Sequence, residues 1–278
     1  MKQMILQFLP IVLLLTLTLI IHFTNIKPFQ RGFFCNDYSL KYPYIENQTI
    51  PTYVCSILWI VISLFTILTT QIISKSFSIR VIRDIIMGAL CCILLTDSIK
   101  YSVGKLRPHF LTVCNPDYDN ICFDKYTYYN DSSGDDEGEG GGRRKEQFYQ
   151  KYVNETNICS LEKSEAMKEA RLSFLSGHAS YSFYFATFLI HFMNEYSKHL
   201  KWGSKIVPFI QLLVVILASW ISITRITDFY HHPLDVFCGA CTGISVASYY
   251  SGGRTSPSTR DQAVDKEVIE LDDNQKHT

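Results

Sequence analysis

The sequence lacks an excess of charge of either sign, because its 278 residues carry 26 basic and 26 acidic side chains. A nucleic-acid-binding protein needs positive charge to neutralise phosphates, so the missing basic excess argues against that class. Charged residues are also scarce, at 19%, whereas hydrophobic residues reach 47%, which is too apolar for a disordered chain. No internal repeat is visible, and no cysteine spacing matches a zinc site.

The chain contains long runs of apolar residues with few charges. A membrane-spanning helix needs about 20 mostly apolar residues to cross ~30 Å of hydrocarbon. Six runs approach this length, and three of them need polar end residues to complete a crossing. They lie at residues 6–23, 53–73, 85–99, 179–193, 206–224 and 236–250. These runs predict an all-α fold, a bundle of six transmembrane helices with a long extracellular loop between the third and fourth spans.

Two other interpretations of these runs are weaker. A cleaved signal peptide has a shorter apolar core and a small-residue cleavage site, which the first run does not show, so a retained anchor is favoured. A single run also fits the buried helix of a soluble protein, but six runs argue against that. The membrane-embedded domain is expected to cover residues 1–251. Residues 132–146 are expected to form a flexible insert without the EF-hand pattern, and residues 252–278 a disordered cytosolic tail.

Loop composition predicts the orientation of the helices. Short loops rich in lysine and arginine are usually cytosolic, which describes the second and fourth loops. Three Asn-x-Ser/Thr sequons fall in the first and third loops, at Asn47, Asn130 and Asn154. Both termini are therefore expected in the cytosol. The expected location is the plasma membrane with an extracellular site, or else the endoplasmic reticulum with a luminal site.

Four of the nine cysteines fall in the predicted outer loops, whereas the other five lie within spans and are expected to be core residues. The outer four are Cys35, Cys114, Cys122 and Cys159. Four cysteines allow three disulfide pairings, and the sequence does not choose among them.

Ionisable and small polar residues gather in three clusters beside the outer ends of predicted spans. Ionisable groups are costly in a membrane, so such clusters indicate function. The members are Lys100 and Arg107 after the third span, Ser176, Gly177 and His178 before the fourth, and Arg225, His231 and Asp235 between the fifth and sixth. Singly, each has a simpler interpretation, since lysine and arginine often reach toward headgroups and a lone histidine is more often structural. Their gathering on one side favours a single site.

The cationic members of these clusters suit a phosphate group. Lys100, Arg107 and Arg225 supply three fixed positive charges against the nearly two negative charges of a phosphomonoester. Ser176 and Gly177 precede a predicted helix, whose free N–H groups favour anions, and the glycine allows a close approach. This set predicts a phosphate-binding pocket that needs neither a metal nor another cofactor.

The two histidines complete a reaction scheme. His231 and Asp235 are four residues apart, so on a helix they share one face, and Asp235 is expected to orient His231 as the nucleophile. Attack on phosphorus would give a phosphohistidine intermediate. His178 is expected to act as the general acid and then as the base, protonating the leaving alkoxide and later activating water.

The clusters resemble the signature of the lipid phosphate phosphatases, within the type 2 phosphatidic acid phosphatase and haloperoxidase superfamily. The matching elements are K-x6-RP from Lys100 to Pro108, SGH at Ser176 to His178, and R-x5-H-x3-D from Arg225 to Asp235. The resemblance also covers the run from Arg31 to Asp37, and it departs where Leu175 and Thr224 replace a frequent proline and serine. It implies a six-span, magnesium-independent enzyme acting on phosphatidate, lysophosphatidate, sphingosine 1-phosphate or ceramide 1-phosphate, with His231 as the nucleophile and His178 as the acid.

Three alternatives belong to other functional classes. A non-catalytic lipid-binding protein of the same fold is disfavoured because all the expected catalytic groups are present. A metal-dependent hydrolase with His178, His231 and Asp235 as ligands is disfavoured by three neighbouring cations. A transporter is disfavoured because the charges gather at one edge rather than near the midplane. In the last span Gly239 and Gly243 form a G-x-x-x-G, which allows packing within one subunit or in a homo-oligomer, the former being favoured.

Overall fold

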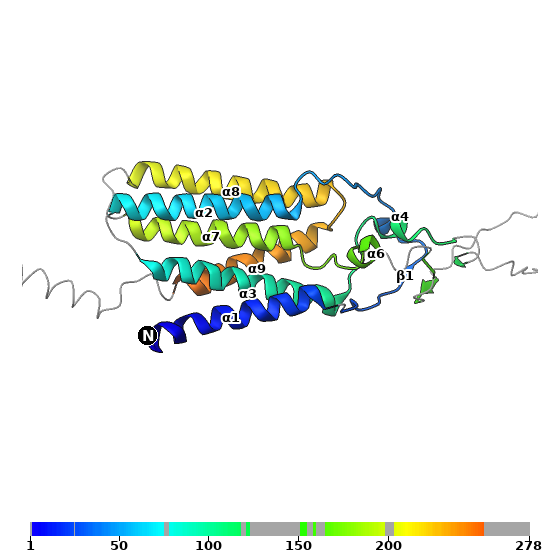
Figure 1. Ribbon diagram of the computed structural model, residues 1–278. Helices are drawn as coiled ribbons and strands as arrows, with labels where there is room; N and C mark the ends of the chain where they lie inside the picture. The colour runs from blue at the N-terminus through cyan, green and yellow to red at the C-terminus, as the bar shows by residue number, and fades with distance from the viewer. Residues whose placement is uncertain are drawn as a thin grey trace, which may run out of the picture.

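The computed structural model describes residues 2–24, 26–74, 78–117, 121–122, 151–154, 158–159, 165–197 and 203–252. Long helices dominate this part of the chain, and each predicted span lies largely or wholly within one of them. They are α1 (Lys2–Phe23), α2 (Thr52–Ser74), α3 (Ile79–Val103), α7 (Gly177–Ser197), α8 (Gly203–Thr227) and α9 (Pro233–Gly252). Figure 1 shows these helices side by side in an elongated bundle. The predicted insert at 132–146 and the tail from residue 253 lie outside the described residues.

Two of the six helices are long and apolar enough to cross a membrane by composition alone, over Thr52–Ile73 and Lys205–Thr227. A shorter apolar stretch, Phe8–Phe23, lies in α1. Large apolar side chains such as Phe65 of α2 and Phe209 of α8 are exposed on the outside of the bundle. Such surfaces indicate a membrane protein, because water-soluble monomers rarely expose apolar patches of this extent.

Helix α7 is more polar than α2 and α8, and it lies at the centre of the bundle, in contact with α2, α3, α8 and α9. Its serines bond to neighbouring helices, with the Trp59 indole N–H donating to the Ser182 hydroxyl at 2.9 Å. Thr96 and Ser180 join their hydroxyls at 3.0 Å. Polar groups paired in this way do not face lipid, which explains how α7 packs in a bundle without being apolar all round.

The G-x-x-x-G of α9 packs against α7. A Cβ added to Gly239 would lie 2.5 Å from the Ser176 carbonyl oxygen, and one on Gly243 would lie 2.1 Å from that of Ser180. Only a residue without a side chain permits this approach. The motif therefore serves packing within one subunit, in agreement with the interpretation that the sequence favours.

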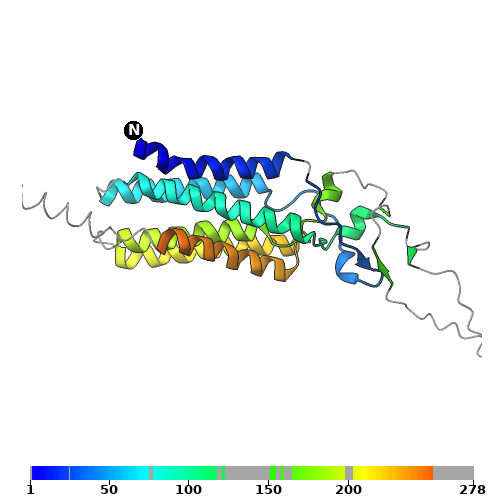
Figure 2. The same ribbon diagram turned by 90° about the horizontal axis from the view of Figure 1, so that it is seen from below.

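A small separate core covers one end of the bundle (Figures 1 and 2). It comprises β1 (Phe33–Phe34), a 3₁₀ turn η1 (Tyr38–Leu40), α4 (Phe110–Cys114), β2 (Tyr152–Val153) and α6 (Glu165–Glu169). Strands β1 and β2 pair in antiparallel register, with Phe33 opposite Val153. The all-α prediction missed this pair, since two-residue strands are too short to show an alternating pattern.

Two disulfides stabilise this outer core, one between the first and third loops and one within the third loop, and they resolve the pairing that the sequence left open. Cys35 is bonded to Cys122, and Cys114 to Cys159.

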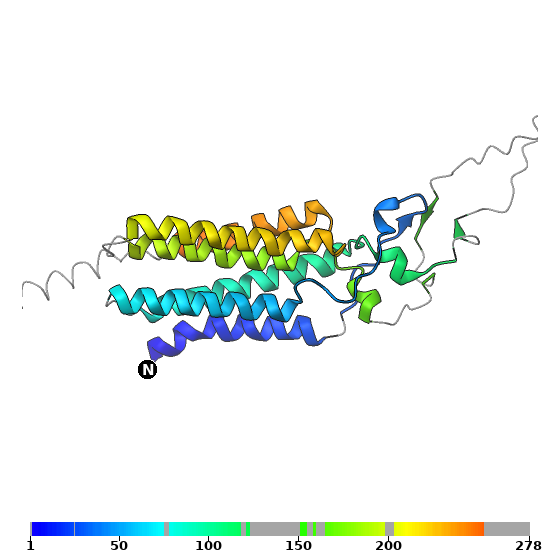
Figure 3. The same ribbon diagram turned by 90° about the horizontal axis from the view of Figure 1, so that it is seen from above.

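Figure 3 shows the chain beginning at the end of the bundle opposite the outer core, and α9 also runs toward that end.

Candidate functional site

The three predicted clusters meet at the end of the bundle beneath the outer core. Backbone hydrogen bonds join their segments: Arg107 N–H donates to the Ala170 carbonyl at 2.8 Å, and Ser173 N–H to the Lys105 carbonyl at 2.9 Å. Ser176 N–H donates to the Asp235 carbonyl at 3.0 Å. The segment that precedes α7 is therefore hydrogen-bonded both to the segment after α3 and to the start of α9.

Gly104 turns the chain at the end of α3. Its φ is 56°, in the left-handed region, and a Cβ there would meet the Phe29 carbonyl oxygen at 1.9 Å. A glycine in this conformation is a common helix stop. The turn leaves Lys100 in the last turn of α3 and carries Arg107 across the end of the bundle.

Lys100 reaches the first turn of α7. Its Nζ lies 3.1 Å from the place that a Cβ on Gly177 would occupy. The glycine therefore leaves room for the ammonium group beside the N-terminus of α7, where unpaired backbone N–H groups also favour an anion. Ser176, fully buried, caps this helix weakly, its Oγ accepting from Ala179 N–H at 3.5 Å.

Two buried guanidinium groups flank one aromatic ring. Arg107 lies 4.9 Å and Arg225 5.5 Å from the centre of the Tyr230 ring, and their exposed fractions are only 7% and 1%. Within the described residues, the Nε–H of each arginine has no hydrogen-bond partner. An unpaired buried donor is costly, so the pair is suited to receive an anion.

Residues of the first loop hold Arg225 and His178. Gln48 Oε1 accepts from the Arg225 guanidinium at 2.8 Å, and Asp228 accepts from its other terminal nitrogen. Thr49 in turn donates to Asp228 through its backbone N–H and its hydroxyl, at 2.9 and 2.7 Å. The His178 Nε2 lies 3.1 Å from the Ile50 carbonyl oxygen, to which it can only donate.

Sequence reasoning missed Gln48, Thr49 and Asp228. Asp228 carried a detectable signal, since a carboxylate three residues after Arg225 lies on the same face of one helix. The two loop residues carried none, because their partners lie more than 170 residues away along the chain.

The predicted contact between Asp235 and His231 is wrong. His231 Nδ1 donates instead to the Ser173 carbonyl oxygen at 2.6 Å. Asp235 accepts from the Ser173 hydroxyl and from Lys105 Nζ, both at 2.6 Å, and from His232 N–H at 3.1 Å. Helix α9 begins only at Pro233, so His231 precedes it and the rule for residues four apart on a helix does not apply. Asp235 is linked to His231 through Ser173.

His231 is held as a neutral imidazole. It is 3% exposed, and burial, followed by the nearby charges of Arg107 and Lys100, holds its pKa well below the usual range. Because Nδ1 carries the proton donated to Ser173, the lone pair lies on Nε2. A neutral imidazole nitrogen with a free lone pair is chemically capable of acting as a nucleophile.

Of the three predicted glycosylation sites, two lie in described loop segments. Asn47 and Asn154 are exposed, as a glycan acceptor must be, whereas Asn130 lies outside the described residues.

Thr224 donates its hydroxyl to the Ile221 carbonyl of its own helix at 2.7 Å, a bond that serine also makes. In the described part of the chain, no three His, Cys, Asp or Glu side chains are grouped so as to hold a metal ion.

Comparison with known proteins shows the family to which the chain belongs. The family model described as the PAP2 superfamily matches residues 59–254. The chain is 32% identical to "Phospholipid phosphatase 1" of Rattus norvegicus over 253 residues, covering 85% of this chain and 79% of that protein. It is 29% identical to "Putative phosphatidate phosphatase" of Drosophila melanogaster, covering 84% and 65%. For "Phospholipid phosphatase 2" of Homo sapiens the identity is 29%, covering 80% and 72%. No solved structure matches the chain.

Proposed function

Because this chain belongs to the PAP2 superfamily and is a phosphatase, we propose that it hydrolyses lipid phosphate monoesters without a metal ion. The substrates proposed are phosphatidate, lysophosphatidate, sphingosine 1-phosphate and ceramide 1-phosphate. One observation carries the proposal: two buried guanidinium groups with unpaired N–H donors flank the Tyr230 ring, and Arg107 is close enough to the buried His231 to help hold its imidazole neutral.

In the first step, His231 Nε2 attacks phosphorus and the bond between phosphorus and the lipid oxygen breaks. His178 gives a proton to the departing alkoxide, which leaves as the lipid alcohol. Burial and the charges of Arg225 and Lys100 lower the pKa of His178 to about 3, so His178 holds this proton only beside the negatively charged phosphate of the substrate. The His178 Nε2–H is engaged by Ile50, so Nδ1 is the nitrogen proposed to carry that proton. Arg107, Arg225 and Lys100 stabilise the charge on the transferring phosphoryl group, the main catalytic task in phosphoryl transfer.

In the second step, water attacks the phosphohistidine. His178, now neutral, takes a proton from this water as the bond from phosphorus to His231 Nε2 breaks, and inorganic phosphate is released. His231 returns to its neutral form, and His178 is again ready to donate a proton. The cycle consumes one water molecule and yields one alcohol and one phosphate.

The proposed role of Asp235 is to position Ser173 rather than to contact the nucleophile. Its carboxylate holds the Ser173 hydroxyl, and the Ser173 carbonyl holds His231 Nδ1. This chain of hydrogen bonds fixes the tautomer and the direction of the ring, which is the task that a carboxylate performs directly in a catalytic triad.

The six helices are proposed to span the membrane, with the site on the extracellular side of the plasma membrane or in a lumen. The apolar outer faces of α2 and α8 support this, as do the two disulfides and the exposed Asn47 and Asn154 at the site end. Residues 1–251 then form the membrane domain, with 132–146 as an outer insert and 252–278 as a cytosolic tail.

The assay that tests this proposal measures phosphate release from phosphatidate in detergent micelles, with and without EDTA. Turnover is expected to be unchanged by the chelator, because three fixed cations take the place of a metal. Phosphatidylglycerol with the same acyl chains is the control and should release no phosphate. Loss of activity in EDTA would support a metal-dependent hydrolase, and binding without turnover by well-folded protein would support a lipid-binding role.

A further inference from the structure

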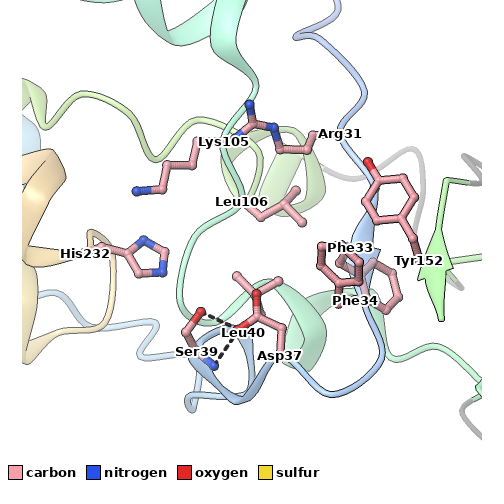
Figure 4. A pocket seen from close by; sticks show the side chains of 11 residues that line it. Arg31, Phe33, Phe34, Asp37, Ser39, Leu40, Lys105, Leu106, Tyr152 and His232 are labelled. Carbon is pink, nitrogen blue, oxygen red and sulfur yellow. Dashed lines mark hydrogen bonds between the residues drawn. The ribbon is translucent and has the colours of Figure 1, made fainter. Parts of the chain in front are cut away.

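A cavity of about 320 Å³ lies in the outer core, next to the proposed phosphate pocket (Figure 4). Its walls come from the run after α1, from β2, from the segment after α3 and from the turn before α9. Arg31, Lys105 and His232 line it together with Phe33, Asp37 and Tyr152. Lys100, Arg107 and Arg225 do not line this cavity, so it is separate from the phosphate pocket.

The cavity is lined by two cations, of which one is not paired with a carboxylate in the described part of the chain. Figure 4 shows Arg31 and Lys105 along one rim and Asp37 across from them. In the described part of the chain Arg31 has no ion-pair partner, whereas Lys105 is paired with Asp235. The Asp37 carboxylate already accepts from the Ser39 N–H and hydroxyl, at 2.9 and 2.6 Å. A small anion would therefore settle near Arg31 and Lys105, away from Asp37.

Two residues of this cavity also hold Asp235. Lys105 Nζ lies 2.6 Å from one carboxylate oxygen, and His232 Nδ1 lies 3.3 Å from the other. Asp235 in turn holds Ser173, whose carbonyl positions His231. An anion that draws Lys105 toward the cavity would compete with Asp235 for the ammonium group and disturb this chain.

We infer that the cavity is a second anion-binding site, which accepts an oxyanion of the phosphate class and lowers turnover when it is filled. The oxyanion can come from two sources, the phosphodiester of a membrane lipid headgroup or free inorganic phosphate. Binding is independent of the proposed function, whereas the effect on turnover rests on it.

Binding to the purified full-length protein in detergent tests the site. The probes are inorganic phosphate and glycerophosphoglycerol, a soluble phosphodiester that a monoester phosphatase does not hydrolyse, and binding is measured by titration calorimetry. Arg31→Gln is expected to weaken the outer site about tenfold, as the loss of a charge-assisted hydrogen bond would. The side chain of Arg31 is exposed, and its backbone carbonyl, which accepts from Arg171, is kept in the variant, so the variant should fold.

Lys41→Gln is the matched control, since it removes an exposed cation from the same outer segment without touching the cavity. It should leave both affinities unchanged. Weaker glycerophosphoglycerol binding in Arg31→Gln supports a lipid headgroup as the source, and loss of a second phosphate site alone supports free phosphate. The inference is overturned if Arg31→Gln binds each probe as tightly as the wild type does. It is also overturned if the wild type binds neither probe at a second site.

Turnover provides a separate readout. Glycerophosphoglycerol should lower kcat of the wild type without raising KM, and it should lose this effect in Arg31→Gln, whose uninhibited activity is expected to stay near that of the wild type. If the protein proves to have no phosphatase activity, the proposed function fails while the binding result still stands or falls by itself.

Discussion

His231→Ala is expected to lower kcat by roughly four orders of magnitude or more, as removal of a catalytic nucleophile does in other hydrolases that form a covalent intermediate. The reason is that His231 Nε2 is the only neutral lone pair proposed to attack phosphorus. The measurement is the initial rate of phosphate release from phosphatidate micelles, at saturating substrate.

The matched control for this variant is His22→Ala, which removes an exposed imidazole from α1. It should keep wild-type kcat. Thermal unfolding of both variants separates catalytic loss from unfolding, since the His231 side chain also bonds to Ser173. A correctly folded His231→Ala protein with activity within tenfold of the wild type would contradict the assignment.

Arg225→Ala is expected to lower kcat/KM by about 10²–10³, the usual cost of losing a preorganised donor to a transition-state oxyanion. Arg225→Lys should recover little of this loss. Gln48 and Asp228 hold the two terminal nitrogens, which fixes the guanidinium plane and leaves the Nε–H unpaired, and an ammonium group cannot reproduce that plane.

Arg83→Ala is the control for Arg225, because Arg83 forms an ion pair with Asp84 near the start of α3, away from the site. Its activity should stay near that of the wild type. An Arg225→Lys protein with full activity would show that only charge matters at this position, and it would refute a catalytic role for the guanidinium plane.

The helices and the gathering of the clusters could be predicted from the sequence because both depend on local features. Each apolar run is a property of about 20 neighbouring residues, and motif residues such as Lys100 and His178 lie at the ends of these runs. Helix ends on one side of a bundle are close together, so side chains at those ends come together as well.

The parts that escaped prediction depend on backbone groups and on distant loops. The Ser173 and Ile50 carbonyls that hold the two histidines leave no mark in a side-chain pattern. The outer cavity beside Lys105 depends on contact between loop one and loop three, which the Cys35–Cys122 disulfide joins, and the sequence did not determine that pairing.

The error over Asp235 had a signal in the sequence. Pro233 is typical of the first position of a helix, and the residue before a proline avoids the helical conformation. Together these place the start of α9 after His232, so His231 and Asp235 never share a helical face. Because α9 begins two residues after His231, the Asp235 carboxylate does not contact His231 directly and is linked to it through Ser173.

The most direct test of the central claim is to trap the phosphoryl group on the enzyme. Wild-type protein is mixed with phosphatidate labelled with ³²P, quenched in alkali within milliseconds, and digested for peptide mapping. The account predicts label on the peptide that contains His231, stable in base and lost in acid, and no label on His231→Ala. Label on any other residue, or label that persists in His231→Ala, would contradict it.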